Sequence, residues 1–383
     1  MKYNQIGKSN LKVSQICLGT MTMGVQNNKE QSHELMNYAF NNGINFFDTA
    51  EQYPSPSSKE LYGITEKIVG EWINKKRNRK DLVLATKMSG PGVPWIRGGG
   101  LQYDIINIRK AVEGSLKRLN TDYIDLYQLH WPERFFQNFA FDTKIKINDN
   151  YNKLELILST FQDLIKEGKI RYIGLSNEDL SGLKAYTDLI KKNNFPEITT
   201  MQNRYNLLFR NYDSELIEFC KINKISFLGY SPLAFGTLSG KYVNNSQQQS
   251  RLKLYPGYFD RYSGNESKKS IIKYSKISKL NNLKLVEMSL SYCIQKPFLT
   301  SVIIGSTTIN QLKEIFNSIN IELSQKIIDE IDSVHLENSN PTYYREFRLF
   351  DYLNNALKLI LGGKFLDFYT KSVKLVKRII NYN

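Results

Sequence analysis

Four side chains in the first third of the sequence have the types needed to deliver a proton. Asp48 follows the apolar pair Phe46–Phe47, Tyr53 comes five residues later, and Lys87 and His130 each end another apolar run. A phenol is a poor acid because its pKa is about 10, and a neighbouring ammonium lowers that pKa. A carboxylate keeps such an ammonium charged and oriented, and an imidazole bonds a substrate oxygen or relays the proton. The four residues therefore predict a tyrosine proton donor, Tyr53, tuned by Lys87.

Each of these residues also fits a structural role. Asp48 suits a strand-end cap, Tyr53 could pack beside Pro54, Lys87 could form an ordinary salt bridge, and His130 could be a core histidine. The last alternative is weakened because His33 and His335, the other two histidines, fall in segments expected to be surface helices. We favour the catalytic interpretation because one mechanism uses all four groups.

The elements that must position these residues alternate regularly along the chain. After a short hairpin at residues 2–14, buried strands are expected at 16–20, 45–48, 82–87, 123–130, 170–176, 198–203, 225–231 and 301–304. Segments with helical spacing of apolar residues lie at 30–40, 65–75, 106–119, 154–167, 180–191, 214–223, 283–295 and 309–318. Alternation of this kind predicts an α/β fold with a parallel sheet.

The count of strands separates two α/β architectures. An open doubly wound sheet fits the alternation, but no Gly-x-Gly-x-x-Gly follows the first strand, and eight strands suit closure. The prediction is a (β/α)8 TIM barrel with an N-terminal hairpin. Functional groups of such barrels gather at the C-terminal strand ends. Besides the four residues above, these ends carry Ser176, Asn177, Gln202, Tyr230 and Ser231.

Composition excludes several classes of protein. The chain has 383 residues, 41% of them hydrophobic and 23% charged, which is typical of a soluble globular protein. Neither a membrane-spanning run nor a signal peptide is evident, so a cytoplasmic location is expected. The three cysteines are too far apart for a disulfide framework or a metal site. The net charge of +15 comes without a nucleic-acid-binding motif and is explained by attraction of a phosphorylated cofactor.

Several ordered motifs resemble the aldo-keto reductase superfamily. They lie at residues 44–53, 85–87, 125–131, 168–177 and 230–234, and the resemblance runs from about residue 2 to 335. Residues 19–24, 129–134 and 235–242 are most similar to the bacterial Tas-type branch. The resemblance implies an oxidoreductase in which NADPH, or NADH, gives a hydride to an aldehyde or ketone. It also implies that Tyr53 protonates the oxygen with the support of Asp48, Lys87 and His130.

The same resemblance assigns cofactor contacts by position. Ser176, Asn177 and Gln202 would hold the nicotinamide carboxamide, and Tyr230 would stack on its ring. The segment from Ser231 to Lys241 would wrap the pyrophosphate, and the helix start at 305–308 would bind the phosphate on the adenosine ribose. The remaining implied contacts are Gly19, Thr20, Met21, Pro232, Leu233, Gly236, Leu238, Arg251, Gly305, Ser306, Thr307, Gln311 and Glu314.

Two long segments after the third and fourth strands are expected to shape the substrate pocket. Trp95 and Trp131, with Phe135 and Phe136, would line it, although anchoring of their own loops is an equally good interpretation.

The C-terminal segment, residues 341–383, is expected to lie outside the barrel domain of residues 1–340. From 342 on it carries eight Lys or Arg and three Asp or Glu, with apolar residues at helical spacing. Two basic amphipathic helices are expected. They would dock on the barrel or a partner subunit, or attach to a membrane surface.

A non-enzymatic role is the competing hypothesis. A regulatory or sensing module that binds a nicotinamide cofactor and turns over little would share this fold, since fold alone does not determine function. The intact set of Asp48, Tyr53, Lys87 and His130 favours the enzyme.

Overall fold

A computed structural model describes residues 1–90, 93, 95–98, 103–133, 153–211, 215–242, 251–255, 258–339 and 341–342. Its contacts divide the chain into two compact units. The first comprises Met1–Tyr205, Tyr212–Ser231 and Cys293–Ile319, and the second comprises Asn206–Asn211, Pro232–Tyr292 and the chain from Asn320 on. Apart from Pro341 and Thr342, the predicted C-terminal tail lies outside the described residues, as do Phe135 and Phe136.

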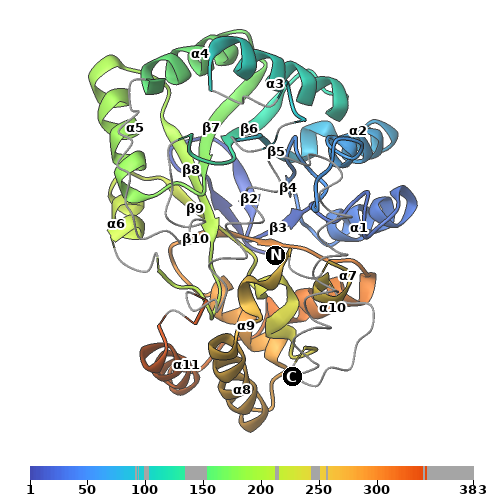
Figure 1. Cartoon of the computed structure of the whole chain (residues 1–383), viewed down its shortest axis with the longest axis vertical. Coiled ribbons are helices and arrows are strands. Elements are labelled where there is room, and N and C mark those ends of the chain that lie inside the picture. The colour runs from blue at the N-terminus through green and yellow to red at the C-terminus, as the bar shows by residue number, and fades with distance from the viewer. Residues whose placement is uncertain are drawn as a thin grey trace, which may run out of the picture. The chain divides into compact units, whose positions relative to one another are not determined.

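Parallel strands of the first unit close into a barrel (Figure 1), which confirms the predicted TIM-barrel fold. The strands are β3 (Ile16–Gly19), β4 (Phe46–Asp48), β5 (Val83–Met88), β6 (Ile124–Leu129), β7 (Ile170–Ser176), β8 (Ile198–Arg204), β9 (Ser226–Tyr230) and β10 (Leu299–Ile304). They pair in the order β10-β3-β4-β5-β6-β7-β8-β9. Every residue of β4, β5, β6 and β8 is buried, because barrel strands are covered on both faces.

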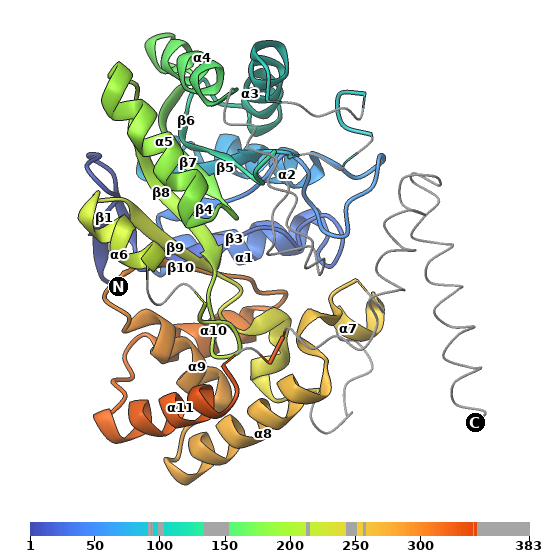
Figure 2. The ribbon, with the colours of Figure 1, turned by 60° about the vertical axis from the view of Figure 1, so that its left-hand side comes forward.

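Helices follow these strands and surround the barrel (Figures 1 and 2). They are α1 (Lys29–Asn41), α2 (Ile64–Lys76), α3 (Ile105–Leu119), α4 (Leu154–Lys166), α5 (Leu180–Asn193), α6 (Glu215–Ile222) and α10 (Ile309–Ser318), with the 3-10 turn η1 (Arg79–Asp81) before β5. Polar side chains start several of them: Asn28, Asp104, Asp179 and Thr308 each accept a backbone N–H of the first turn. Such caps satisfy N–H groups that have no partner within the helix.

The predicted hairpin consists of β1 (Tyr3–Gln5) and β2 (Lys12–Ser14), which pair antiparallel. Its residues Ile6, Leu11 and Val13 are buried in one apolar cluster with barrel residues from β3, β4, β5, β6, β9 and β10. The Asn4 amide donates to the Thr300 carbonyl at the start of β10. The hairpin therefore fills the N-terminal end of the barrel and leaves the C-terminal end for a site.

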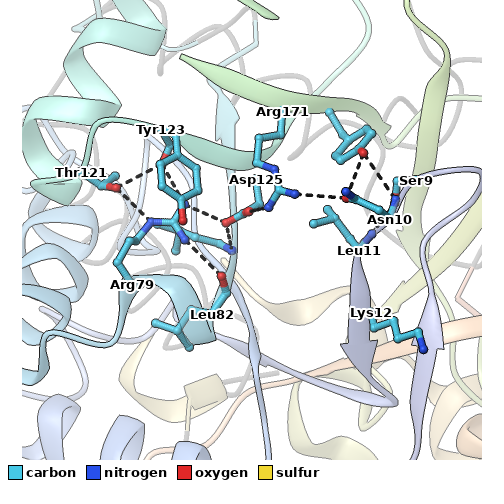
Figure 3. Close-up of polar contacts among 12 residues, drawn as sticks. Ser9, Asn10, Leu11, Lys12, Arg79, Leu82, Thr121, Tyr123, Asp125 and Arg171 are labelled. Carbon is cyan, nitrogen blue, oxygen red and sulfur yellow. Dashed lines mark hydrogen bonds and ion pairs between the residues drawn. The ribbon is translucent and has the colours of Figure 1, made fainter. Parts of the chain in front are cut away.

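A buried carboxylate reinforces this N-terminal end (Figure 3). Asp125 of β6 pairs with Arg79 at 2.7 Å and with Arg171 at 2.6 Å, and it accepts the Leu84 N–H at 3.0 Å. The Arg171 guanidinium also donates a hydrogen bond to the Asn10 side-chain oxygen, in the loop of the hairpin, at 3.1 Å. Residues at this end of a TIM barrel serve stability rather than chemistry.

The second unit holds helices that the sequence patterns predict only in part. It contains η3 (Ala234–Ser239), α7 (Arg251–Leu254), η4 (Asp260–Tyr262), α8 (Asn265–Leu280), most of α9 (Leu285–Ile294) and α11 (Gln325–Glu337). The helix α9 was expected, and α11 contains His335, which was expected to lie in a surface helix; α7 and α8 lie outside the predicted elements. Within the described residues, no helix is both long and apolar enough to cross a membrane.

Candidate active site

Asp48, Lys87 and His130 lie at the C-terminal ends of three neighbouring strands. Asp48 is the last residue of β4, Lys87 lies one residue before the end of β5, and His130 directly follows β6. Asp48 pairs in register with Ala85, and Lys87 with Gln128. Parallel strands bring such ends to one edge, so Asp48 and His130, which are 82 positions apart in the sequence, meet in one place.

Asp48 and Lys87 form a buried ion pair. The Lys87 Nζ atom lies 2.6 Å from Asp48 Oδ2 and also donates to the Thr49 carbonyl at 2.9 Å. The Lys87 side chain is 0% exposed and that of Asp48 is 3% exposed. A buried ammonium is stabilised by a counter-charge and by hydrogen bonds, and both are present. Lys87 is therefore a fixed cation at the barrel mouth.

Tyr53 places its ring beside this cation. Lys87 Nζ lies 5.1 Å from the centroid of the Tyr53 ring, and the His130 ring lies 5.7 Å from it, edge to face at 79°. The Tyr53 carbonyl accepts the Gly63 N–H at 3.0 Å, which ties the loop to the start of α2. The structure thus brings all four predicted residues into one cluster, and Tyr53 is partly open to solvent.

His130 is held as a neutral imidazole. Burial lowers its pKa well below the ordinary value, and the Lys87 charge lowers it further. Its ring stacks on Trp131 with centroids 5.5 Å apart. Within the described part of the chain, the buried Nδ1 atom has no hydrogen-bond partner. A neutral imidazole whose ring nitrogen has no partner among the described residues is suited to form a hydrogen bond with a ligand.

This shift predicts how stability depends on pH. The unfolded chain protonates this histidine with a pKa of about 6.5, whereas the folded chain keeps it neutral to lower pH. Below about pH 6.5 the unfolded state therefore binds more protons, and His130 contributes a loss of up to about 1.4 kcal/mol per pH unit as pH falls. Urea unfolding at pH 7, 6 and 5 should give a shallower loss for His130→Gln than for wild type. Equal slopes would mean that the pKa of His130 is the same in the folded and the unfolded chain.

Two glutamine amides complete the surroundings of Asp48. Gln202 of β8 donates to Asp48 Oδ1 at 2.9 Å, and Gln128 of β6 donates to the same oxygen at 3.3 Å. Gln202 was assigned to the cofactor by resemblance, and here its amide orients the carboxylate that holds Lys87. Gln128 was not among the predicted residues, although its position two before His130 places it on the same face of β6.

Ser176, Asn177 and Tyr230 form a hydrogen-bonded chain along the next strand ends. The Tyr230 hydroxyl donates to Asn177 Oδ1 at 2.7 Å, and the Asn177 amide donates to the His130 carbonyl at 2.8 Å. The Ser176 hydroxyl donates to the Gln202 carbonyl at 3.0 Å. Asn177 adopts a φ of +58°, which asparagine tolerates better than most residues. These groups are fixed before any ligand binds.

Gly19, Thr20 and Met21 connect β3 to the loop that carries Tyr53. The Thr20 N–H and hydroxyl both donate to the Asp48 carbonyl at 3.0 Å, and the Met21 carbonyl accepts the Ser55 N–H at 3.0 Å. A side chain at Gly19 would approach Ile303 within 2.9 Å. This segment therefore supports the site from the side opposite Lys87.

The predicted phosphate contacts Ser306 and Thr307 lie just before α10. Thr308 caps this helix, and the Gln311 side chain accepts from the Thr307 N–H at 2.9 Å and from its hydroxyl at 3.2 Å. Asn27 donates to the Thr307 carbonyl at 2.8 Å. Gly305 precedes this turn and Glu314 lies one turn into the helix. Helix N-termini bind anions, so the position suits a phosphate, while Gln311 is used within the loop itself.

The other predicted cofactor residues lie in the second unit. Pro232 and Leu233 lead into η3, which contains Gly236 and the buried Leu238. Burial lowers the pKa of Lys241 and of Arg251, and the charge of Arg251 lowers that of Lys241 further. Two neighbouring cations repel each other, and an anion would relieve this cost. The pair therefore fits a diphosphate group.

Of the predicted pocket residues, Trp131 lies beside His130, and its carbonyl accepts a hydrogen bond from the buried Tyr103 hydroxyl. Trp95 is half-buried, and its indole nitrogen has no hydrogen-bond partner in the described residues. In the same described residues, no group of three or more His, Cys, Asp or Glu could hold a metal ion.

Comparison with known proteins identifies the family. Residues 15–336 match the model of the Aldo/keto reductase family. Protein tas of Escherichia coli is 39% identical over 339 residues, covering 88% of this chain and 98% of its own. The uncharacterized oxidoreductase YrpG of Bacillus subtilis is 30% identical over 87% of this chain and 96% of its own. An aldo-keto reductase of Babesia bovis is 36% identical over 61% of this chain and 87% of its own. The chain therefore belongs to the aldo/keto reductase family and is an oxidoreductase.

Proposed function

We propose that the chain is an NADPH-dependent reductase that converts an aldehyde or ketone into an alcohol, with Tyr53 as proton donor. The observation that carries this proposal is the buried Asp48–Lys87 pair with Lys87 Nζ 5.1 Å from the Tyr53 ring centroid. A cation at this distance stabilises the phenolate that remains once Tyr53 has given up its proton.

Each residue of the cluster has a role in this reaction. A nicotinamide cofactor, when bound, supplies the hydride that reaches the carbonyl carbon. Tyr53 gives its hydroxyl proton to the carbonyl oxygen as the C=O π bond breaks, and water later reprotonates the phenolate. Lys87 offsets the negative charge on Tyr53, and Asp48 holds the Lys87 ammonium in place. The neutral His130 orients the carbonyl oxygen through a hydrogen bond.

Two groups of residues support a phosphorylated cofactor. Lys241 and Arg251 offer adjacent positive charges to a diphosphate. Ser306 and Thr307 offer the start of α10 to a further phosphate, which favours NADPH over NADH. Asn177 and Tyr230 stand beside His130 and would hold and stack on the nicotinamide.

A carbonyl panel tests the proposal. The full-length protein is incubated with NADPH and a series of aliphatic and aromatic aldehydes and ketones, and the loss of cofactor absorbance is matched to the alcohol formed. We expect at least one alcohol to form in a one-to-one ratio with cofactor oxidised, and faster with NADPH than with NADH. Tight cofactor binding without reduction of any carbonyl would instead favour the sensing module.

A further inference from the structure

Two buried carboxylates and two arginines form a network outside the described active site. Glu51 is 2% exposed and Glu66 is 0% exposed. Glu51 forms an ion pair with Arg97 and lies 3.9 Å from Arg118, and Arg118 pairs with Glu66 at 2.6 Å. The Glu66 carboxylate also accepts from the Thr86 hydroxyl at 2.6 Å. The set is balanced in charge, as a buried network must be.

This network lies between the strands and the outer helices rather than in the barrel mouth. Successive side chains of a strand point to opposite faces. Lys87 points inward to Asp48, so Thr86 and its partner Glu66 on α2 lie on the outer face of β5. The buried Tyr127 hydroxyl belongs to the same region, because Glu51 and Glu66 both raise the pKa of Tyr127 in addition to the effect of burial. These residues are therefore out of reach of the carbonyl substrate.

The Glu51 carboxylate nevertheless joins two segments that flank the active site. Glu51 lies two residues before Tyr53, and its N–H donates to the Lys87 carbonyl at 3.0 Å. Its carboxylate accepts the Ser89 N–H at 3.0 Å and also pairs with Arg97, eight residues further on. The Ser89 hydroxyl donates to Gln52 at 3.0 Å. One buried side chain thus joins Ser89 and Arg97, both after β5, to the loop that carries Tyr53.

We propose that Glu51 and Arg97 are positioning residues: their ion pair fixes the segment after β5 against the loop that carries Tyr53. We call the Glu51–Arg97 ion pair, together with the Glu51–Ser89 hydrogen bond, the tether. The inference rests on the proposed function for its effect on catalysis, but the existence of the tether is independent of that function. Removing Glu51 leaves the Arg97 charge without its carboxylate, and removing Arg97 leaves Glu51 with only the more distant Arg118 at 3.9 Å. Both segments then loosen, and Tyr53 loses its alignment with Lys87.

The experiment compares Glu51→Gln, Arg97→Met, Arg97→Lys and the double variant Glu51→Gln/Arg97→Met with wild type. The matched control is Asp125→Asn, a carboxylate that is 1% exposed and holds two arginines at the opposite end of the barrel. Hydrogen–deuterium exchange is followed in a peptide of residues 86–98, which excludes the Leu84 N–H that Asp125 accepts. The melting temperature, kcat, KM and NADPH affinity are measured for each protein.

We expect the Glu51→Gln and Arg97→Met variants to exchange at least roughly tenfold faster than wild type in this peptide. Their kcat/KM should fall roughly tenfold or more, mainly through kcat, with little change in NADPH affinity, because small misplacements of a catalytic group are costly. Arg97→Lys should recover part of both effects. The double variant should be no worse than the worse single variant, because both changes remove the same interaction.

The control separates positioning from general stability. Asp125→Asn should lower the melting temperature while leaving exchange in residues 86–98 and kcat near wild type, because the one backbone N–H of β5 that Asp125 is seen to accept, that of Leu84, lies outside these residues. Unchanged exchange in both Glu51→Gln and Arg97→Met would overturn the tether, and faster exchange with unchanged kcat/KM would overturn the positioning role. Equal losses in Asp125→Asn would also overturn it. If wild type reduces no carbonyl, the proposed reaction fails, and exchange still decides whether the tether exists.

Discussion

Tyr53→Phe should lose carbonyl reduction by about 10²- to 10⁴-fold in kcat, which is the usual contribution of a positioned general acid. The substitution removes one hydroxyl and keeps the ring that lies 5.1 Å from Lys87 Nζ and 5.7 Å from the His130 ring. The fold should persist, since the Tyr53 backbone keeps its hydrogen bonds to Ala50 and Gly63. The measurement is the rate of NADPH oxidation with the best substrate of the panel.

NADPH affinity, followed by fluorescence titration, distinguishes loss of chemistry from loss of binding. Tyr53→Phe should bind NADPH as wild type does, because no predicted cofactor contact involves the hydroxyl. Tyr62→Phe is a matched control, since it removes a hydroxyl from a partly buried tyrosine nine residues away. If Tyr53→Phe kept wild-type kcat, another group would be the proton donor.

The barrel could be predicted because its strands are short apolar runs that the fold buries on both faces. The run at 82–87 became β5 (Val83–Met88), and the run at 170–176 became β7 with the same bounds. By contrast, α8 was missed. Its sequence carries five lysines and several serines, and its buried apolar positions, such as Ile271 and Ile277, are too few to give a clear helical stripe.

The position of the candidate active-site cluster was predictable for a related reason. Strand ends are visible in the sequence, and the barrel rule brings them together, so Asp48, Lys87 and His130 could be placed from their positions alone. The partners of Glu51 could not be predicted from the sequence. Arg97 lies in a loop and Arg118 in a helix, and their side chains meet Glu51 only after the helices pack. Gln128 was missed because a glutamine in a buried strand has no distinctive pattern.

Lys87→Met should remove the positive charge that stabilises the phenolate of Tyr53 during the proposed reaction. Loss of one preorganised charge or donor at the reacting atoms costs about 10² to 10³ in kcat. The substitution also leaves the Asp48 carboxylate buried with only the Gln202 and Gln128 amides and no cation. Breaking a buried pair in this way costs about 3–5 kcal/mol of stability, so the single variant alone would confuse unfolding with lost chemistry.

The double variant Asp48→Asn/Lys87→Met resolves this difficulty. It removes both charges from the barrel mouth, and Asn still fits the hydrogen bonds from the glutamine amides through its carbonyl oxygen. A buried ion pair replaced by neutral groups of similar volume is often tolerated, so urea unfolding should show most of the lost stability restored. Its kcat should stay as low as that of Lys87→Met, because no cation faces Tyr53. If the double variant regained wild-type kcat, Lys87 would act through stability alone, and the ion pair would be a structural element of the barrel.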